Sequence, residues 1–143
     1  ETPFELGKAE IFWLPETGLA QVGIIATGAL LHKALFAAKE LETEGIKTKV
    51  MNLTTIKPLD EKSVLELAKE CKKIVTVEEH QVAGGMGSAV AEFLAQNYPV
   101  QMEFVGVHDK FGQSGTPLEL IEHYKMGKDG VIDAVKKILN RKS

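Results

Sequence analysis

Residues 75–94, VTVEEHQVAGGMGSAVAEFL, join three local patterns in one short stretch. An apolar run at 74–77 ends in two carboxylates and a histidine at 78–80. A glycine-rich turn follows at 84–87, and apolar residues then recur at helical spacing. The stretch therefore predicts a strand, a loop and a helix, with polar side chains at the carboxyl end of the strand.

The same alternation of apolar strands and amphipathic helices runs through the rest of the chain. Strands are expected at 10–14, 22–27, 47–53, 73–77 and 101–107, and helices at 29–44, from Asp60 onward, and at 87–97, 118–124 and 129–140. Asp60 is expected to be an N-cap, and Gly127 to separate the last two helices. Such alternation is typical of a parallel sheet covered on both faces. We predict an α/β fold, a single three-layer α/β/α domain over residues 10–143, entered by a linker at 1–9.

Composition excludes several classes of protein. The 143 residues are 44% hydrophobic and 26% charged, which fits one globular domain. The net charge of -3 and the absence of a basic stripe argue against a nucleic-acid partner. No apolar run approaches the roughly 18 residues of a membrane span, so we expect no membrane association. The single cysteine, Cys71, is expected to fill the core, and it fits a reducing compartment such as the cytoplasm. The chain begins at Glu1, and we expect it to be part of a larger polypeptide.

A candidate ligand or interface loop lies where the parallel strands are expected to end, since ligands of such sheets bind at that edge. Its members are Glu79, His80, Gly84, Gly85, Gly87 and Ser114. The glycines could cradle an anion at a helix start. However, the pattern is not G-x-G-x-x-G, no P-loop lysine is present, and two carboxylates precede the glycines. We favour a tight turn that lets the helix pack closely on the sheet.

The polar residues 78–80 could also form an acid/base group or half a metal site. Neighbouring residues of a strand point to opposite faces, so at most two of them converge, and His108 or Asp109 would have to complete a metal site. We favour a hydrogen-bonded loop anchor or a contact with a neighbouring subunit. Ser114 and His80 could act as nucleophile and base, but no G-x-S-x-G elbow supports this. We therefore assign no catalytic, cofactor-binding or metal-ligating residue.

Several motifs together resemble the C-terminal domain of the transketolase family of thiamine-diphosphate enzymes. They are the stretch at 75–94, GKAEIF at 7–12, VGIIATGALLHKALFAAKELETEGIKTKVMNLTTIKPLD at 22–60 and GVHDKFGQSGTPLELIEHY at 106–124. Deoxyxylulose-phosphate synthase and the beta subunits of 2-oxoacid dehydrogenases share this domain. The late loop FGQSG at 111–115 and the Glu79-His80 pair are closer to transketolases.

The resemblance implies a mixed five-stranded sheet whose first strand is antiparallel to the others. It implies that the complete enzyme moves a two-carbon ketol unit between sugar phosphates of the pentose phosphate type. Thiamine diphosphate and a divalent cation such as magnesium would be held by other domains, and this domain would support packing and a homodimer. Its partners would be the cofactor-binding domains or subunit of the same enzyme. Alternatives are the same domain from deoxyxylulose-phosphate synthase or a dehydrogenase beta subunit, or a nucleotide- or anion-binding regulatory module.

Overall fold

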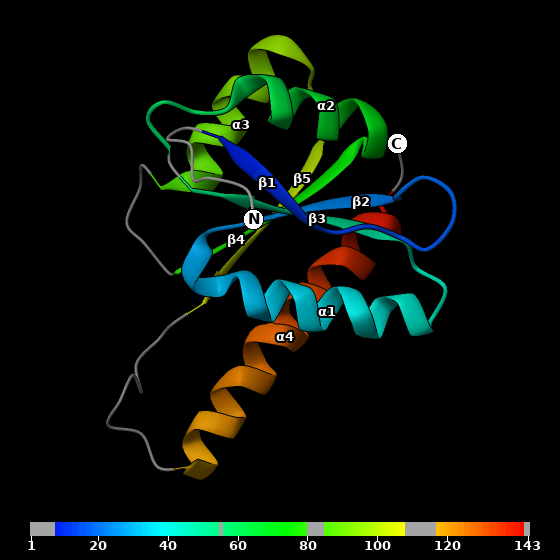
Figure 1. Ribbon diagram of the computed structural model, residues 1–143, viewed down its shortest axis with the longest axis vertical. Helices are drawn as coiled ribbons and strands as arrows, with labels where there is room; N and C mark the ends of the chain where they lie inside the picture. Colours follow the sequence, from blue (N-terminus) through cyan, green and yellow to red (C-terminus); the bar gives the residue numbers. More distant parts are fainter. Residues whose placement is uncertain (1–7, 55, 80–84, 108–116, 142–143) are drawn as a thin grey trace.

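A computed structural model describes residues 8–54, 56–79, 85–107 and 117–141, and it shows a five-stranded sheet between two layers of helices (Figure 1). The strands are β1 (Ala9–Trp13), β2 (Val22–Ala26), β3 (Thr48–Leu53), β4 (Lys73–Glu79) and β5 (Gln101–Val107). The helices are α1 (Leu31–Thr43), which follows a short 3-10 turn at Gly28–Leu30, α2 (Glu61–Cys71), α3 (Met86–Asn97) and α4 (Pro117–Leu139). The predicted α/β class and three-layer architecture are confirmed.

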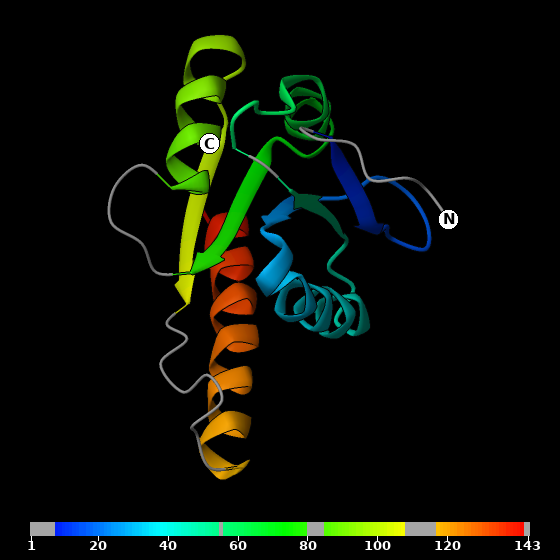
Figure 2. The same ribbon diagram turned by 60° about the vertical axis from the view of Figure 1, so that its left-hand side comes forward.

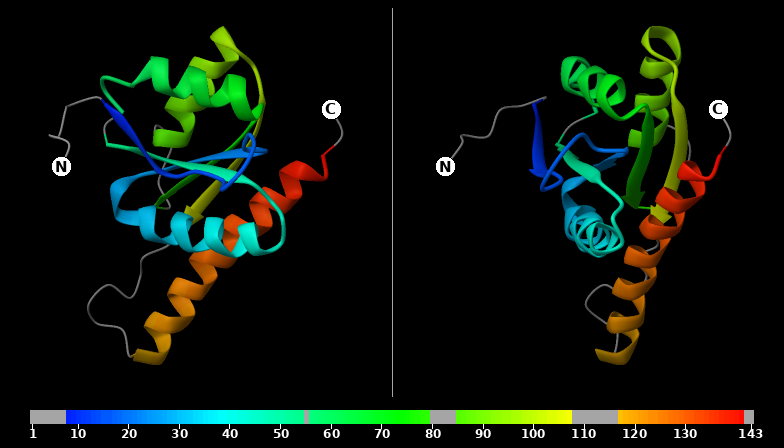
Figure 3. Two further views of the ribbon diagram at one scale, coloured as in Figure 1. Left: turned by 45° about the vertical axis from the view of Figure 1, so that its right-hand side comes forward. Right: turned by 90° about the vertical axis from the view of Figure 1, so that its right-hand side faces the viewer.

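The strand order is β1-β3-β2-β4-β5. Strands β2 to β5 run parallel, whereas β1 pairs antiparallel with β3, as the family resemblance implied. The crossover from β2 places β3 on one side of β2, and the crossover from β3 places β4 on the other side, so the direction of winding reverses between β2 and β4. Strands β1 and β5 form the two outer edges (Figure 3).

Each face of the sheet has its own hydrophobic core. Helices α1 and α4 cover one face, and α2 and α3 cover the other (Figures 1 and 2). Every residue of β2 is buried, because this central strand faces both layers. Cys71 lies in the α2–α3 layer, where burial raises the pKa of its thiol to about 12. This core position is the one expected from the sequence.

The last third of the chain corrects one prediction. Two helices separated at Gly127 were expected, but α4 runs without interruption from Pro117 to Leu139. Gly127 is buried, and a Cβ at this position would lie 3.1 Å from both Cε and Nζ of Lys33 on α1. Lys33 is itself only 2% exposed. The glycine therefore makes room for a buried lysine between two helices, and a helix accepts such a glycine at a cost of about 1 kcal/mol.

Asp60 ties the start of β1 to the start of α2. Its carboxylate accepts hydrogen bonds from the backbone N–H of Ser63 at 3.1 Å, from the Ser63 hydroxyl at 2.8 Å and from the backbone N–H of Ala9 at 2.8 Å. The predicted N-cap is confirmed. Burial by itself would raise the pKa of Asp60, but these hydrogen bonds outweigh it and lower the pKa below the ordinary 3.8.

We expect Asp60→Asn to lower the free energy of unfolding by about 1–2 kcal/mol near neutral pH, since a cap and an inter-element hydrogen bond weaken. Because the folded-state pKa is depressed, this stabilisation is present above the unfolded pKa and is lost as pH falls through the folded value. Urea titrations at several pH values should show the wild-type advantage shrinking below about pH 4. An advantage that grows with acidity would contradict this assignment.

Lys72 ends α2 in the left-handed conformation, with φ 63° and its N–H bonded to the carbonyl of Ala68. It is the only non-glycine residue with positive φ in the described part of the chain. We expect Lys72→Gly to raise the free energy of unfolding by about 0.5–1 kcal/mol, because glycine adopts this conformation without strain. Lys69→Gly, inside the last turn of the same helix, should instead lower it by about 1 kcal/mol. If thermal unfolding showed that both variants change the free energy of unfolding in the same direction, the backbone strain at Lys72 would be refuted.

No helix in the described ranges combines the length and the apolar character that crossing a bilayer requires.

Candidate functional site

The carboxyl ends of the four parallel strands meet at one edge of the sheet, as predicted. Glu79 ends β4 and is exposed, Gly85 is the N-cap of α3, and Gly87 lies buried in the first turn of α3. The other predicted members of the loop, His80, Gly84 and Ser114, lie outside the described residues, as do His108 and Asp109. The described site is therefore the junction between β4 and α3.

Glu78 occupies the start of α3. Its Oε1 accepts a hydrogen bond from the backbone N–H of Met86 at 2.9 Å, and its Oε2 accepts one from the backbone N–H of Gly87 at 2.8 Å. These N–H groups lie in the first turn of the helix, where no preceding helical carbonyl can accept a hydrogen bond from them. A carboxylate there also matches the positive end of the helix dipole. Glu78 thus closes the loop by bridging the end of the strand to the start of the helix.

The glycines at this junction allow the carboxylate to approach the backbone. A Cβ on Gly87 would lie 2.7 Å from Oε2 of Glu78 and 2.9 Å from Oγ1 of Thr76, distances that Cβ atoms do not adopt. A Cβ on Gly85 would meet Oε1 of the same carboxylate. Close approach of backbone to another group is the ordinary reason for glycine in such a turn. The anion that this helix start accommodates is the chain's own glutamate.

Asn52 lies at the same edge, at the end of β3. Asn52 is 8% exposed, and its Oδ1 is buried with no hydrogen-bond partner among the described residues. The nearest glycine is Gly28, which opens the turn into α1, and a Cβ there would be 3.9 Å from that Oδ1. Thr27 between them donates its N–H to the carbonyl of Val77 at 3.3 Å. This part of the edge therefore holds one buried amide oxygen beside the turn into α1.

The described residues do not fit a diphosphate cofactor. The α3 start would be the natural place for phosphate oxygens, but two of its N–H groups already bond to Glu78, whose negative charge would repel a phosphate. Within the described ranges, no group of three or more His, Cys, Asp or Glu side chains is placed to hold a metal ion. The junction is suited to hold β4 and α3 together.

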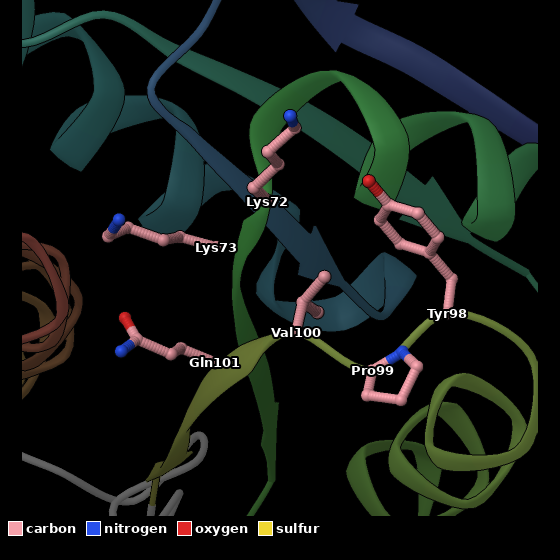
Figure 4. A pocket seen from close by; sticks show the side chains of 6 residues that line it. All are labelled: Lys72, Lys73, Tyr98, Pro99, Val100 and Gln101. Carbon is pink, nitrogen blue, oxygen red and sulfur yellow. The ribbon is translucent and has the colours of Figure 1, made fainter. Parts of the chain in front are cut away.

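A hollow of about 400 Å³ opens at the opposite, amino edge of the sheet, and its lining is Lys72, Lys73, Tyr98, Pro99, Val100 and Gln101 (Figure 4). Its polar groups do not converge: Lys72 and Tyr98 extend in one direction, whereas Lys73 and Gln101 extend in another. Helices α2 and α3 both end beside it, so the negative ends of two helix dipoles face this region. The positive charges of Lys72 and Lys73 offset those dipoles. Because the polar side chains of the lining point in different directions, they do not form a binding site for an anion.

Two features of the packing were missed in the sequence. One is Glu78, which caps α3 from eight and nine residues before Met86 and Gly87, a separation for which no local spacing rule exists. The other is Lys33, a charged residue that the sequence pattern does not place in the core, yet it is among the largest fully buried side chains. The signal in the sequence is that Lys33 lies four residues before Ala37 and eight before Leu41, so the three residues share one side of α1.

Comparison with known proteins gives a consistent family match. The family described as "Transketolase, C-terminal domain" matches residues 16–131. The chain is 41% identical over 140 residues to the 6-deoxy-6-sulfo-D-fructose transketolase subunit SqwH of Clostridium sp. (strain MSTE9), covering 98% of this chain and 42% of that subunit. It is 39% identical to 1-deoxy-D-xylulose-5-phosphate synthase of Syntrophus aciditrophicus (strain SB), covering 95% of this chain and 21% of that enzyme.

A solved structure agrees in fold as well as sequence. It is described as "Split gene transketolase, inactive beta4 tetramer", and it superimposes with a TM-score of 0.80 at 42% identity, covering 99% of this chain and 45% of that one. The chain therefore spans less than half the length of these three proteins.

Proposed function

This chain belongs to the transketolase C-terminal domain family, and from that premise we propose that it completes an enzyme that transfers a two-carbon ketol unit between sugar phosphates. Thiamine diphosphate and magnesium would be bound by the other domains or subunit of that enzyme and would supply its carbanion chemistry. The pentose phosphates are the proposed substrates, and the cytoplasm is the proposed location. The complete enzyme is proposed to be a homodimer.

Within that enzyme we propose that this domain supports assembly and makes no contact with the cofactor. The observation that carries this role is the pair of hydrogen bonds from Met86 and Gly87 to Glu78, which fills the helix start that a diphosphate would need. Residues 10–143 would form one unit entered by a linker at 1–9. The loop with Glu79, His80, Gly84, Gly85, Gly87 and Ser114 would face a neighbouring domain or subunit.

A two-part activity measurement tests this function. The chain alone, with thiamine diphosphate, magnesium and sugar phosphates, should give no turnover above background. The chain co-expressed with the cofactor-binding part of the same enzyme should transfer ketol units from a ketose phosphate to an aldose phosphate. Turnover by the chain alone would overturn the accessory role, and an assembled enzyme without ketol transfer would overturn the proposed reaction.

The second candidate is the same domain in a 1-deoxy-D-xylulose-5-phosphate synthase, which the relative from Syntrophus aciditrophicus supports. The two activities differ in their product, because the synthase by its name forms 1-deoxy-D-xylulose 5-phosphate. Identifying the sugar phosphate that the assembled enzyme forms separates them. A regulatory nucleotide or anion site would appear as a rise in the unfolding midpoint of the chain with ATP, NAD or phosphate.

A further inference from the structure

Exposed apolar side chains concentrate in one segment of the described chain. Six large hydrophobic residues are exposed in the described part of the chain, and four of them fall within residues 11–19. These four are Ile11, Phe12, Leu14 and Leu19, with exposed fractions of 42%, 47%, 60% and 72%. We call them the β1 apolar surface. Isolated exposed hydrophobic residues are ordinary, but such a concentration marks an interaction surface.

The β1 apolar surface lies on an edge strand and the turn that follows it. Strand β1 has β3 as its only neighbour, so its other edge is unpaired in the described structure (Figure 3). The register between β1 and β3 skips Phe12, which is the extra residue of a β-bulge between Ile11 and Trp13. A bulge twists an edge strand and hinders the addition of a further strand. A partner is therefore expected to contact the side chains of β1, and not to extend the sheet.

A small hollow adjoins this surface. It measures about 80 Å³ and lies between β1 and α2, with Ile11, Met51 and Leu67 on its apolar side. Lys49, Ser63 and Glu66 supply its polar rim. An apolar centre with a polar rim is the usual anatomy of a protein interface. One aliphatic side chain from a partner would fill the hollow.

The lengths of the relatives indicate which partner this is. The chain matches 42% of the SqwH subunit and 45% of the split gene transketolase chain, and the matching domain is C-terminal by its family description. Most of the remainder of those proteins therefore precedes this domain. Strand β1 is the first described element of the domain, so in such proteins the preceding part joins next to β1.

We propose that the β1 apolar surface is the docking surface for the cofactor-binding part of the same enzyme. This inference rests on the proposed function, because it names the surface through which the domain would support assembly. The four apolar side chains would pack against that part and exclude water from the contact. Burial of these four side chains would also remove the exposed apolar area that the domain presents alone.

The test compares Phe12→Ser and Leu19→Ser with a matched control, Phe36→Ser. Phe36 is 56% exposed on α1 and lies outside the β1 apolar surface. Each variant is co-expressed with the cofactor-binding part of the same enzyme, and the assembled fraction and ketol transfer are measured. We expect at least a tenfold loss of assembly for Phe12→Ser and Leu19→Ser together, with Phe36→Ser unchanged. The thermal midpoint of each chain alone should stay that of the wild type.

Each other outcome overturns a specific step. Loss of assembly in Phe36→Ser but not in the β1 variants would place the interface on α1 and would leave the proposed function intact. Failure of the wild-type chain to assemble or to restore transfer would overturn the proposed function itself. Light scattering of the chain alone adds a third arm. A wild-type dimer that Leu19→Ser converts to monomer would show that a second copy of this chain occupies the surface, which would overturn the proposed partner.

Discussion

Replacing Glu78 by alanine should lower the free energy of unfolding by about 3 kcal/mol, since two hydrogen bonds to a charged acceptor, each worth roughly 1.5–3 kcal/mol, disappear together. The carboxylate bonds to the N–H groups of Met86 and Gly87, and neither has another acceptor in the helix. Water replaces part of the loss, because Glu78 is only half-buried. Urea unfolding monitored by circular dichroism measures the change directly.

The neighbouring glutamate supplies the control for this prediction. Glu79 is exposed at the end of the same strand, so Glu79→Ala should change the free energy of unfolding by less than about 0.5 kcal/mol. Glu78→Gln should fall between the two, because an amide has one acceptor oxygen where the carboxylate has two. If Glu78→Ala and Glu79→Ala proved equally mild, the bridge between β4 and α3 would contribute nothing to stability.

The strands were predictable because their signals are local. β5 was predicted at 101–107 and is found at Gln101–Val107, since Pro99 precedes it and apolar residues recur along it. The burial of β2 on both faces was likewise visible as an unbroken apolar run. The antiparallel direction of β1 was different, because nothing in a five-residue pattern encodes direction. That feature came from the family resemblance alone.

The failure at α4 has a tertiary cause. The sequence around Gly127 predicts a break in the helix, since glycine is a common helix terminator. In the structure, the side chain of Lys33 on α1 occupies the space beside this glycine. A glycine needed for helix–helix approach and a glycine that ends a helix look the same in one sequence. The distinction requires knowing that α1 and α4 pack on the same face of the sheet.

The sequence placed the candidate loop at the carboxyl edge of the sheet, and the described part of that edge holds contacts that the sequence did not predict. The polar strand end and the glycines were visible in the sequence, and the tight-turn interpretation agrees with the position of Gly87 against Thr76. The hydrogen bonds that Glu78 accepts were not predictable, because they join residues eight and nine positions apart across a loop with no fixed period. The β1 apolar surface was also missed, since exposure of a strand residue depends on what covers the strand.

Gly87→Ala is expected to lower the free energy of unfolding by about 2 kcal/mol, although alanine is the better helix former by up to about 1 kcal/mol. The new Cβ would lie 2.7 Å from Oε2 of Glu78, 2.9 Å from Oγ1 of Thr76 and 2.9 Å from Cδ1 of Phe104. Phe104 is 55% exposed and can move aside, but Thr76 is fully buried in β4. Steric crowding therefore outweighs helix propensity at this position.

The same substitution elsewhere should have the opposite sign. Gly130 lies inside α4, where a Cβ would meet only Cγ1 of Val105 at an ordinary 3.6 Å, so Gly130→Ala should gain about 0.5–1 kcal/mol. Thermal unfolding of both variants separates crowding from propensity. The cost of Gly87→Ala should also shrink in a Glu78→Ala background, because one of the crowded contacts is then gone and the two changes are not additive. Additive effects would mean that Thr76 and Phe104 account for the crowding at Gly87. The approach of Glu78 to the backbone would then not require a glycine.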